Sequence, residues 1–352
     1  MTPNDFLIYG ANGYTGALIA RMAAERGMRP ILAGRSRAAV ASVAAAHGLE
    51  WRAFALDDTA ALDAALAEVG VVLNCAGPFA HTARPMVDAC LRARAHYLDI
   101  TGEAAVFEAL ARRDAQAQAA GIMLLPGAGF DVVPSDCLAA HLKRRCPGAR
   151  RLTLAFRALS RTSWGTATTM VENIQHGGLV RRDGTLVAVP AAHKTRMVDF
   201  GRGPVEVVAI PWGDVATAYH STGIPNIEVF TAFPSSVRRL WAASRPFARL
   251  LGSPPAQRLL KALIRTQPAG PSDVERARGL SLLWGEVEDE AGRRAVTRLR
   301  TPEGYTLTAM TALAIVERAL SGQAPVGFQT PSKAYGADFI MEFEGVARED
   351  VE

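Results

Sequence analysis

Three glycines near the start of the chain stand at a spacing that suits phosphate binding. The sequence Phe6-Leu-Ile-Tyr-Gly10-Ala-Asn-Gly13-Tyr-Thr-Gly16 places them between an apolar run and an alanine-rich segment. Glycine permits a tight turn, lets backbone N–H groups approach a pyrophosphate and lets a helix pack closely on a strand. The alternative is that these glycines only shape a loop. The residues predicted at a dinucleotide diphosphate are Gly10, Asn12, Gly13, Tyr14, Thr15 and Gly16.

A guanidinium and a hydroxyl follow the second apolar run, where the chain reads Leu32-Ala-Gly34-Arg35-Ser36. A site for NAD would place Asp or Glu here, to bind the ribose 2′-hydroxyl. Arginine instead offers a planar fork of donors that matches phosphate oxygens. We therefore predict NADP as the cofactor, with Arg35 and Ser36 at its 2′-phosphate. The alternative interpretation of Arg35 is an ordinary surface arginine.

Two further strand ends are candidates for cofactor contact. Asp57 follows the third apolar run and either meets the adenine or caps the helix that starts at Asp58. The segment Asn74-Cys-Ala-Gly77-Pro78-Phe79 follows the fourth run, and its small side chains suit close approach by a ribose and a nicotinamide. A purely structural turn is the alternative. The residues predicted at the cofactor from this segment are Asn74, Ala76, Gly77 and Pro78.

A parallel sheet must position these turns. From residue 5 to about 145, short apolar runs alternate with alanine-rich helical stretches, which is typical of a sheet covered by helices on both faces. Strands are predicted at 6–9, 30–33, 51–56, 71–74, 97–100 and 122–125, and helices near 14–27, 37–47, 58–68, 83–94, 103–120 and 134–145. We predict an α/β fold, a Rossmann doubly wound parallel sheet in the order 3-2-1-4-5-6, with ligands beyond the carboxyl ends of its strands.

The pattern changes after Cys146-Pro-Gly148. A mixed α/β domain is predicted there, with strands near 152–158, 185–189, 194–200, 204–210 and 226–233, a helix near 166–176, and a hairpin formed by 280–288 and 294–301. The predicted domains are an NADP-binding Rossmann domain at 1–148, a substrate or dimerisation domain at 149–303, and a C-terminal helix and tail at 304–352. Packing of that helix back on the first domain is one arrangement considered.

Composition narrows the classes of function. The 352 residues are 49% hydrophobic and 21% charged, a balance that a disordered chain would not show. Residues 235–266 hold seven basic residues and no acidic residue, so the excess positive charge behind the net charge of +5 lies in this one segment. Most of the chain therefore lacks the positive charge that nucleic acid binding needs, and nucleic acid is not an expected partner. The four cysteines show no metal-ligand spacing, so we expect no metal and free thiols. No secretory signal is visible, which makes the cytoplasm the expected location.

The basic segment 235–266 alternates arginine with bulky apolar residues. Basic amphipathic helices of this kind can lie on an anionic membrane surface or admit a hydrophobic substrate from one. The alternatives are that the apolar face packs on the protein's own core or forms a homodimer interface.

Five motifs together resemble the saccharopine dehydrogenase-like oxidoreductases, and within them the branch of trans-acting enoyl reductases. They are Gly10–Gly16, Ala33–Ser36, Asn74–Phe79, His96-Tyr-Leu-Asp-Ile-Thr-Gly-Glu103 and Pro126-Gly-Ala-Gly-Phe-Asp-Val-Val-Pro-Ser-Asp136. The resemblance implies a Rossmann domain, a second α/β domain that shapes the substrate pocket, NADP and hydride transfer. Family members differ between amino-acid-derived and lipid-linked substrates, so the resemblance leaves the substrate open.

Hydride transfer to a polarised bond also needs a proton donor. Tyr97 lies on the fifth strand, near the residues at its C-terminal end, and is one candidate, although it could be a core residue. Asp131, in the glycine-rich loop after the sixth strand, is a second candidate and equally a loop cap. His176 is a third, on a helix face shared with Glu172, although a solvated polar face is the alternative.

These observations predict an NADP(H)-dependent oxidoreductase that reduces a C=C or C=O bond of a small-molecule or lipid-like substrate. Few basic residues lie near 163–178, which favours an uncharged substrate, while Arg157 and Arg161 keep an amino-acid substrate open. The alternatives are an amino-acid-type C–N oxidoreductase and a non-catalytic NADP-binding protein that associates with a membrane or a partner.

Overall fold

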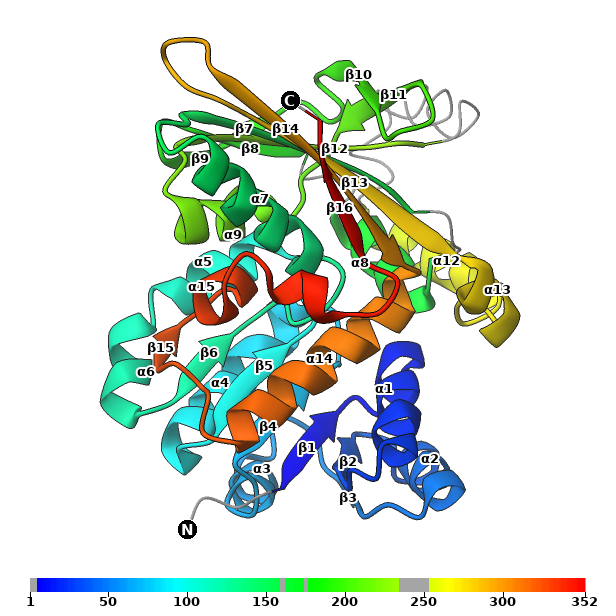
Figure 1. Ribbon diagram of the computed structural model, residues 1–352. Coiled ribbons are helices and arrows are strands. Elements are labelled where there is room, and N and C mark those ends of the chain that lie inside the picture. The colour runs from blue at the N-terminus through cyan, green and yellow to red at the C-terminus, as the bar shows by residue number, and fades with distance from the viewer. Residues whose placement is uncertain (1–4, 159–161, 174–176, 234–252, 352) are drawn as a thin grey trace. The chain divides into compact units, whose positions relative to one another are not determined.

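The computed structural model describes residues 5–158, 162–173, 177–233 and 253–351 (Figure 1). The chain divides into two compact units, each built around one β-sheet. The first unit comprises Met1–Val133 and Tyr305–Ala334, and the second comprises Pro134–Gly304 and Tyr335–Glu352. The first unit thus takes its last two helices and one strand from late in the chain. Among the described residues, no helix has the length and apolar character needed to cross a membrane.

The first unit contains a parallel sheet in the order β15-β6-β5-β4-β1-β2-β3. The predicted order 3-2-1-4-5-6 is confirmed, and β15 adds a seventh strand beside β6. Every residue of β1, β2 and β4 is buried, as expected for a sheet covered on both faces. The strands are β1 Phe6–Tyr9, β2 Ile31–Gly34, β3 Trp51–Ala53, β4 Val71–Asn74, β5 His96–Asp99, β6 Met123–Leu125 and β15 Gly327–Phe328.

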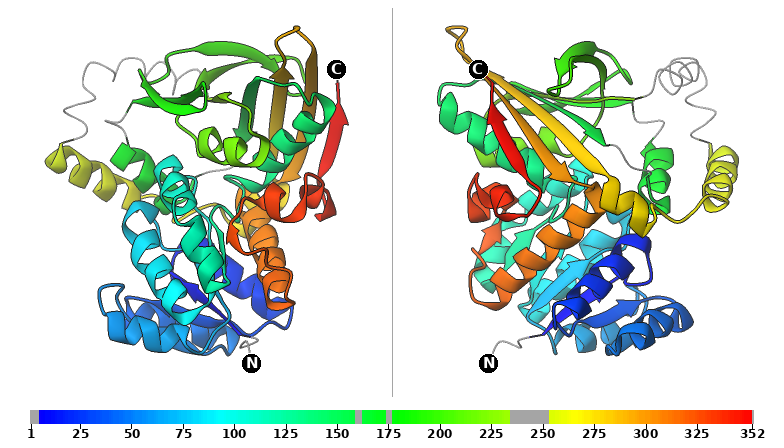
Figure 2. Two further views of the ribbon diagram at one scale, coloured as in Figure 1. Left: turned by 90° about the vertical axis from the view of Figure 1, so that its left-hand side faces the viewer. Right: turned by 45° about the vertical axis from the view of Figure 1, so that its right-hand side comes forward.

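Helices cover both faces of this sheet (Figures 1 and 2). The apolar faces of α3, α4, α5 and α6 pack in one cluster against β1, β2, β4, β5 and β6. The segment 103–120, predicted as one helix, forms two helices, because the N–H of Arg113 bonds to Leu110 in a tightened turn. The helices are α1 Tyr14–Glu25, α2 Arg37–His47, α3 Thr59–Leu66, α4 Phe79–Ala93, α5 Ala104–Ala111, α6 Asp114–Ala120, α14 Gly304–Leu320 and α15 Pro331–Tyr335.

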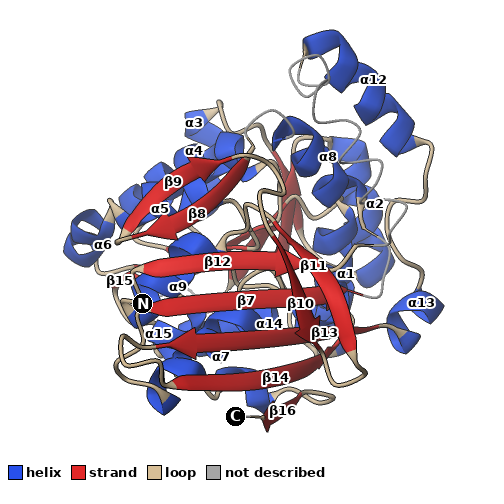
Figure 3. Ribbon diagram, turned by 90° about the horizontal axis from the view of Figure 1, so that it is seen from above, coloured by secondary structure: helices blue, strands red, loops and turns tan. Residues whose placement is uncertain are grey.

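The second unit contains a nine-stranded mixed sheet (Figure 3). Its central strand β7 pairs in parallel with β12 and antiparallel with β13. The predicted hairpin is confirmed by the register of β13 and β14, from Leu280 opposite Pro302 to Glu288 opposite Arg294. The strands are β7 Arg151–Ala158, β8 Gly178–Arg182, β9 Thr185–Val189, β10 Thr195–Asp199, β11 Pro204–Ala209, β12 Asn226–Thr231, β13 Leu280–Glu288, β14 Arg294–Pro302 and β16 Ala347–Asp350.

Helix α7 packs across one face of this second sheet. A Cβ atom on Gly285 of β13 would meet the side chains of Leu138 and Leu142 of α7, so glycine permits the close approach. The opposite face packs Trp284 and Phe230 into a separate apolar cluster with strands β10 and β11. The helices of this unit are α7 Val133–Arg145, α8 Trp164–Asn173, α9 Asp214–Thr222, α12 Pro254–Arg265, α13 Asp273–Arg278 and the 3₁₀ helix η2 Phe339–Glu342.

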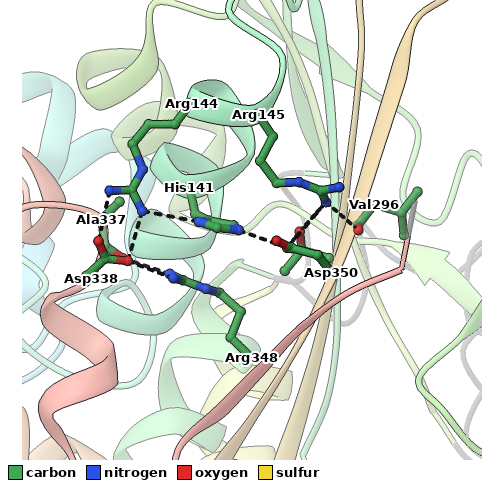
Figure 4. Close-up of polar contacts among 9 residues, drawn as sticks. His141, Arg144, Arg145, Val296, Ala337, Asp338, Arg348 and Asp350 are labelled. Atoms are coloured by element: carbon green, nitrogen blue, oxygen red, sulfur yellow. Dashed lines mark hydrogen bonds and ion pairs between the residues drawn. The ribbon is translucent and has the colours of Figure 1, made fainter.

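A polar network ties the C-terminal residues to α7 (Figure 4). Arg144 donates to Nδ1 of His141 at 3.2 Å and to both carboxylate oxygens of Asp338 at 2.8 Å. Because arginine only donates, Nδ1 accepts, and the ring proton of His141 sits on Nε2 and is donated to Asp350 at 2.8 Å. Arg348 adds a second guanidinium to Asp338 at 2.7 Å. The network therefore fixes β16 beside β14 within the second unit.

Candidate functional site

The turn after β1 is fastened to the end of β2. The N–H groups of Gly10 and Ala11 both donate to the carbonyl oxygen of Ala33, at 2.8 and 3.1 Å. Gly10 has a φ of +81°, and a Cβ atom at this position would lie 2.8 Å from the backbone nitrogen of Ala76. Glycine is therefore required both for the backbone conformation and for contact with the loop after β4.

The N-terminus of α1 carries no capping side chain. Gly13 is its N-cap residue, and no acidic residue occupies the first turn. A Cβ atom at Gly16 would collide with the carbonyl oxygen of Gly10, so this glycine lets the helix pack on the turn. The N–H groups of the first turn and the helix dipole favour an anion. Asn12 and Gly13 are exposed, and Tyr14 and Thr15 are half-buried, at this N-terminus. The chemistry of this turn suits a diphosphate.

The end of β2 presents a cation. Arg35 is exposed, and within the described part of the chain its guanidinium makes no hydrogen bond or ion pair. Burial raises the pKa of Tyr9, while the nearby charge of Arg35 lowers this pKa and that of Asp57 raises it. Arg35 and Asp57 thus both lie near the Tyr9 hydroxyl. Ser36 caps α2, because it accepts from the N–H of Ala39 at 3.4 Å.

Asp57 does not cap the helix that follows it. The N-cap of α3 is Asp58, whose carboxylate accepts from the N–H of Ala61 at 3.0 Å. The capping alternative for Asp57 is therefore wrong, and its exposed carboxylate stands at the same sheet edge as Arg35.

Asn74 organises the loop after β4. Its side chain is fully buried, and its Oδ1 atom accepts from the N–H of Ala76 at 3.0 Å. Its Nδ2 atom donates to Thr82 at 3.2 Å and to the hydroxyl of Tyr97 at 3.4 Å. Asn74 consequently positions the loop from inside the core. The predicted cofactor residues of this loop are the half-buried Ala76 and Pro78 and the exposed Gly77.

Tyr97 and Asp99 form a buried pair at the end of β5. The Tyr97 hydroxyl donates to Oδ2 of Asp99 at 2.7 Å, and Oδ1 accepts from the N–H groups of Thr101 and Gly127, both at 2.9 Å. Burial raises the pKa of Asp99 to about 6, although these hydrogen bonds lower it. Burial also raises the pKa of Tyr97 well above 10. The structure therefore places Tyr97 in the core, where its hydroxyl proton is donated in a hydrogen bond to Asp99.

Glu103 reaches across to a different helix. It is the N-cap residue of α5, yet its carboxylate accepts from the N–H groups of Phe79 and Ala80, at 2.8 and 2.9 Å. These groups begin α4. The side chain therefore anchors the loop from Asn74 to Phe79, a role that sequence reasoning could not assign because the two segments are 24 residues apart.

Asp131 lies in the loop after β6. Its carboxylate faces Gly102, where an added Cβ atom would lie 3.0 Å from Oδ2. The side chain is half-buried, and burial raises its pKa to about 7 from an ordinary value of 3.8. Burial therefore favours the neutral form of the Asp131 carboxyl, which is the form that a general acid requires. His176, the third predicted proton donor, lies outside the described residues.

Helix α14 supports this edge through side-chain contacts that sequence reasoning did not identify, although packing of this helix on the first domain was considered. The rings of Tyr14 and Tyr305 meet edge to face, with centroids 5.0 Å apart. Thr308 accepts from the N–H of Phe130 at 2.9 Å, and Thr311 donates to the carbonyl of Ala128 at 2.8 Å. All these residues belong to the first unit. No local pattern could have paired residues so far apart in the chain.

Comparison with known proteins assigns the first unit. Residues 6–125 match the family model described as the saccharopine dehydrogenase NADP binding domain. This segment is similar to the NADP-binding domain of saccharopine dehydrogenases. The resemblance found in the five motifs and the prediction of NADP are thereby confirmed, and this domain contains the open α1 N-terminus and Arg35.

Trans-acting enoyl reductases of Mycobacterium leprae and Mycobacterium tuberculosis are 35% and 34% identical to the chain over 149 residues. The match covers 40% of this chain, and the chain spans only 36% of the length of each relative. Saccharopine dehydrogenase (L-Glu forming) of Saccharomyces cerevisiae has a similar fold, with a TM-score of 0.68 at 14% sequence identity, over 99% of this chain and all of that chain.

Proposed function

We propose that the protein is an NADPH-dependent reductase that acts on a C=C or C=O bond of a small-molecule or lipid-like substrate. One observation carries the proposal. A carboxyl group with a pKa of about 7, that of Asp131, lies in a loop at the same sheet edge as the glycine cradle of an NADP-binding domain. The names of the mycobacterial relatives favour the C=C bond of an enoyl group.

Different residues of the first unit bind the cofactor and shape the site. Bound NADPH supplies a hydride. The first turn of α1 binds the diphosphate, and Arg35 and Ser36 hold the 2′-phosphate. Gly77 and Pro78 form the wall of the site beyond β4, and Glu103 keeps this wall in place through the N-terminus of α4.

Asp131 is the proposed proton donor. Reduction of a polarised double bond leaves negative charge on the substrate, which a neutral carboxylic acid can quench by transferring its proton. Tyr97 is less suited to this step, because its hydroxyl is buried and already donates to Asp99. We assign Tyr97 a positioning role instead. His176 stays a prediction from the sequence.

The experiment is an assay of NADPH oxidation against a panel of acceptors, which contains enoyl thioesters, enones, ketones, and 2-oxo acids mixed with amino acids. The proposal predicts turnover with an enoyl or carbonyl acceptor, loss of this turnover in Asp131→Asn, and retention of it in Asp58→Asn. Asp58 is the matched control, since asparagine also serves as an N-cap. Turnover only with 2-oxo acid and amino acid mixtures would assign C–N chemistry. Tight NADPH binding without turnover would assign a binding protein.

A further inference from the structure

Helix α12 of the second unit stands out because none of its residues is buried. It packs beside α8, as Figures 1 and 3 show, and Lys261 joins the two helices through a 2.6 Å ion pair with Glu172. Among the described residues, Leu259 and Leu263 of α12 are exposed on the side that faces away from this contact. Pro254–Arg265 therefore does not follow the alternative in which the basic segment packs on the protein's own core, and residues 235–252 of that segment lie outside the described residues.

The open side carries an apolar stripe. Leu259 and Leu263 are 63% and 54% exposed, and they lie one turn apart, so they share a face. The neighbouring helix α8 also has exposed apolar side chains, Met170 at 45% and Trp164 at 38%, although six residues separate them and they lie on different sides of that helix. Exposed apolar side chains that share a face, as Leu259 and Leu263 do, mark contact sites with other proteins or with membranes.

The charges beside the stripe have one sign. Arg258 and Arg265 are exposed on α12, and the helix contains no acidic residue. At about 100° of rotation per residue, Arg258 and Arg265 lie together on the polar side of the helix, roughly 100–160° around the axis from the two leucines. An amphipathic helix with leucines on one face and arginines on its polar side is the arrangement that binds an anionic lipid surface.

We propose that the exposed face of α12 binds the surface of an anionic phospholipid membrane. Leu259 and Leu263 enter the boundary between headgroups and acyl chains, while Arg258 and Arg265 contact acidic headgroups. A second copy of the chain fits less well, because a two-fold contact would bring the same arginines of both copies together. The proposal goes beyond the proposed reductase and does not depend on its activity.

Vesicle sedimentation tests this face. The full chain is mixed at low ionic strength with vesicles of phosphatidylcholine, or of phosphatidylcholine with phosphatidylglycerol. The expected result is binding to the mixed vesicles only, lost on addition of salt. Leu259→Ser combined with Leu263→Ser should weaken partitioning about tenfold or more. Arg258→Gln and Arg265→Gln should each weaken it roughly fivefold.

Two controls keep the test specific. Met197→Ser removes a comparably exposed apolar side chain from β10, outside the proposed face, and should leave vesicle binding unchanged. NADPH titration of every variant reports whether the first unit remains folded, and it is independent of lipid. Absence of binding to the mixed vesicles, or binding that the leucine substitutions leave intact, would overturn the proposal. Self-association that the same substitutions abolish, without vesicle binding, would assign the face to a second copy.

Discussion

The Tyr97 hydroxyl donates a 2.7 Å hydrogen bond to Oδ2 of Asp99 inside the core of the first unit, directly beneath the edge where three loops meet. Asn74 donates to the same hydroxyl from β4, and Gly127 donates to the other Asp99 oxygen from the loop after β6. The buried pair therefore links the loops that follow β4, β5 and β6.

Tyr97→Phe separates positioning from catalysis. Removal of the hydroxyl leaves Asp99 short of one donor, so the free energy of unfolding should fall by about 1–3 kcal/mol in denaturant titration. The rate of NADPH oxidation should fall less than tenfold, because Asp131 rather than Tyr97 supplies the proton. A loss of turnover of about a hundredfold or more, with stability and NADPH affinity unchanged, would make Tyr97 the catalytic residue.

Arg35→Asp tests the cofactor preference. The substitution removes a guanidinium and places a carboxylate where the 2′-phosphate is expected, so the Kd for NADPH should rise about 10- to 100-fold in fluorescence titration. The Kd for NADH should change much less. Arg29→Asp is the control, since Arg29 is also exposed but precedes β2 at its opposite end. Equal loss of both nucleotides in Arg35→Asp would contradict the assignment.

Gly10→Ala measures how tightly the turn is packed. Gly10 combines a φ of +81° with a Cβ position 2.8 Å from the nitrogen of Ala76. Gly48 has a φ of +61° and no atom within 4 Å of its Cβ position, so Gly48→Ala reports the backbone cost alone, about 1 kcal/mol. Thermal unfolding should show a loss of about 3 kcal/mol or more for Gly10→Ala, together with weaker NADPH binding. Equal losses would mean that the contact with Ala76 is unimportant.

Asp131 predicts a pH dependence with a definite sign. If its neutral acid form donates the proton, kcat should fall as pH rises through about 7. Asp131→Asn should lower kcat by about 10²- to 10⁴-fold and remove this alkaline decline.

The same pKa also predicts an effect on stability. Because folding raises the pKa of Asp131 from 3.8 to about 7, the favourable contribution of its protonated form is complete at low pH and is lost as pH rises through about 7. Asparagine stays neutral, so Asp131→Asn should be more stable than the wild type by about 4 kcal/mol near pH 8, and the two proteins should be nearly equally stable near pH 4. Thermal unfolding at both pH values measures this. The opposite order near pH 8 would contradict the raised pKa.

Asp350→Ala probes the attachment of the C-terminal strand. Asp350 accepts from His141 at 2.8 Å and from Thr297 at 2.7 Å, and it joins Arg145 at 3.3 Å (Figure 4). Its loss should speed amide exchange in β16 and leave NADPH binding unchanged, because the network belongs to the second unit. Glu349→Ala is the control, since that side chain is 67% exposed and has one long contact with Arg298. Unchanged exchange in Asp350→Ala would show that β-pairing alone holds the strand.

The sequence by itself determined the strand order of the first unit, the glycine turn and the arginine after β2. Each depends on neighbours within one strand–turn–helix unit, and alternating apolar runs and glycine spacing report such local structure directly. The hairpin of β13 and β14 could be predicted for the same reason, because its two strands are neighbours in the sequence.

Tertiary structure alone decided what the charged and aromatic side chains do. Glu103 caps α4 instead of its own helix, Tyr305 of α14 packs on Tyr14, and residues 338–350 are joined to α7. The partners in these contacts lie between 24 and nearly 300 residues apart in the chain. A hydrogen bond or ring contact between such residues produces no repeating pattern in the sequence from which it could be predicted. Likewise, Asp131 acquires a pKa near 7 only because folding buries its carboxyl group beside Gly102.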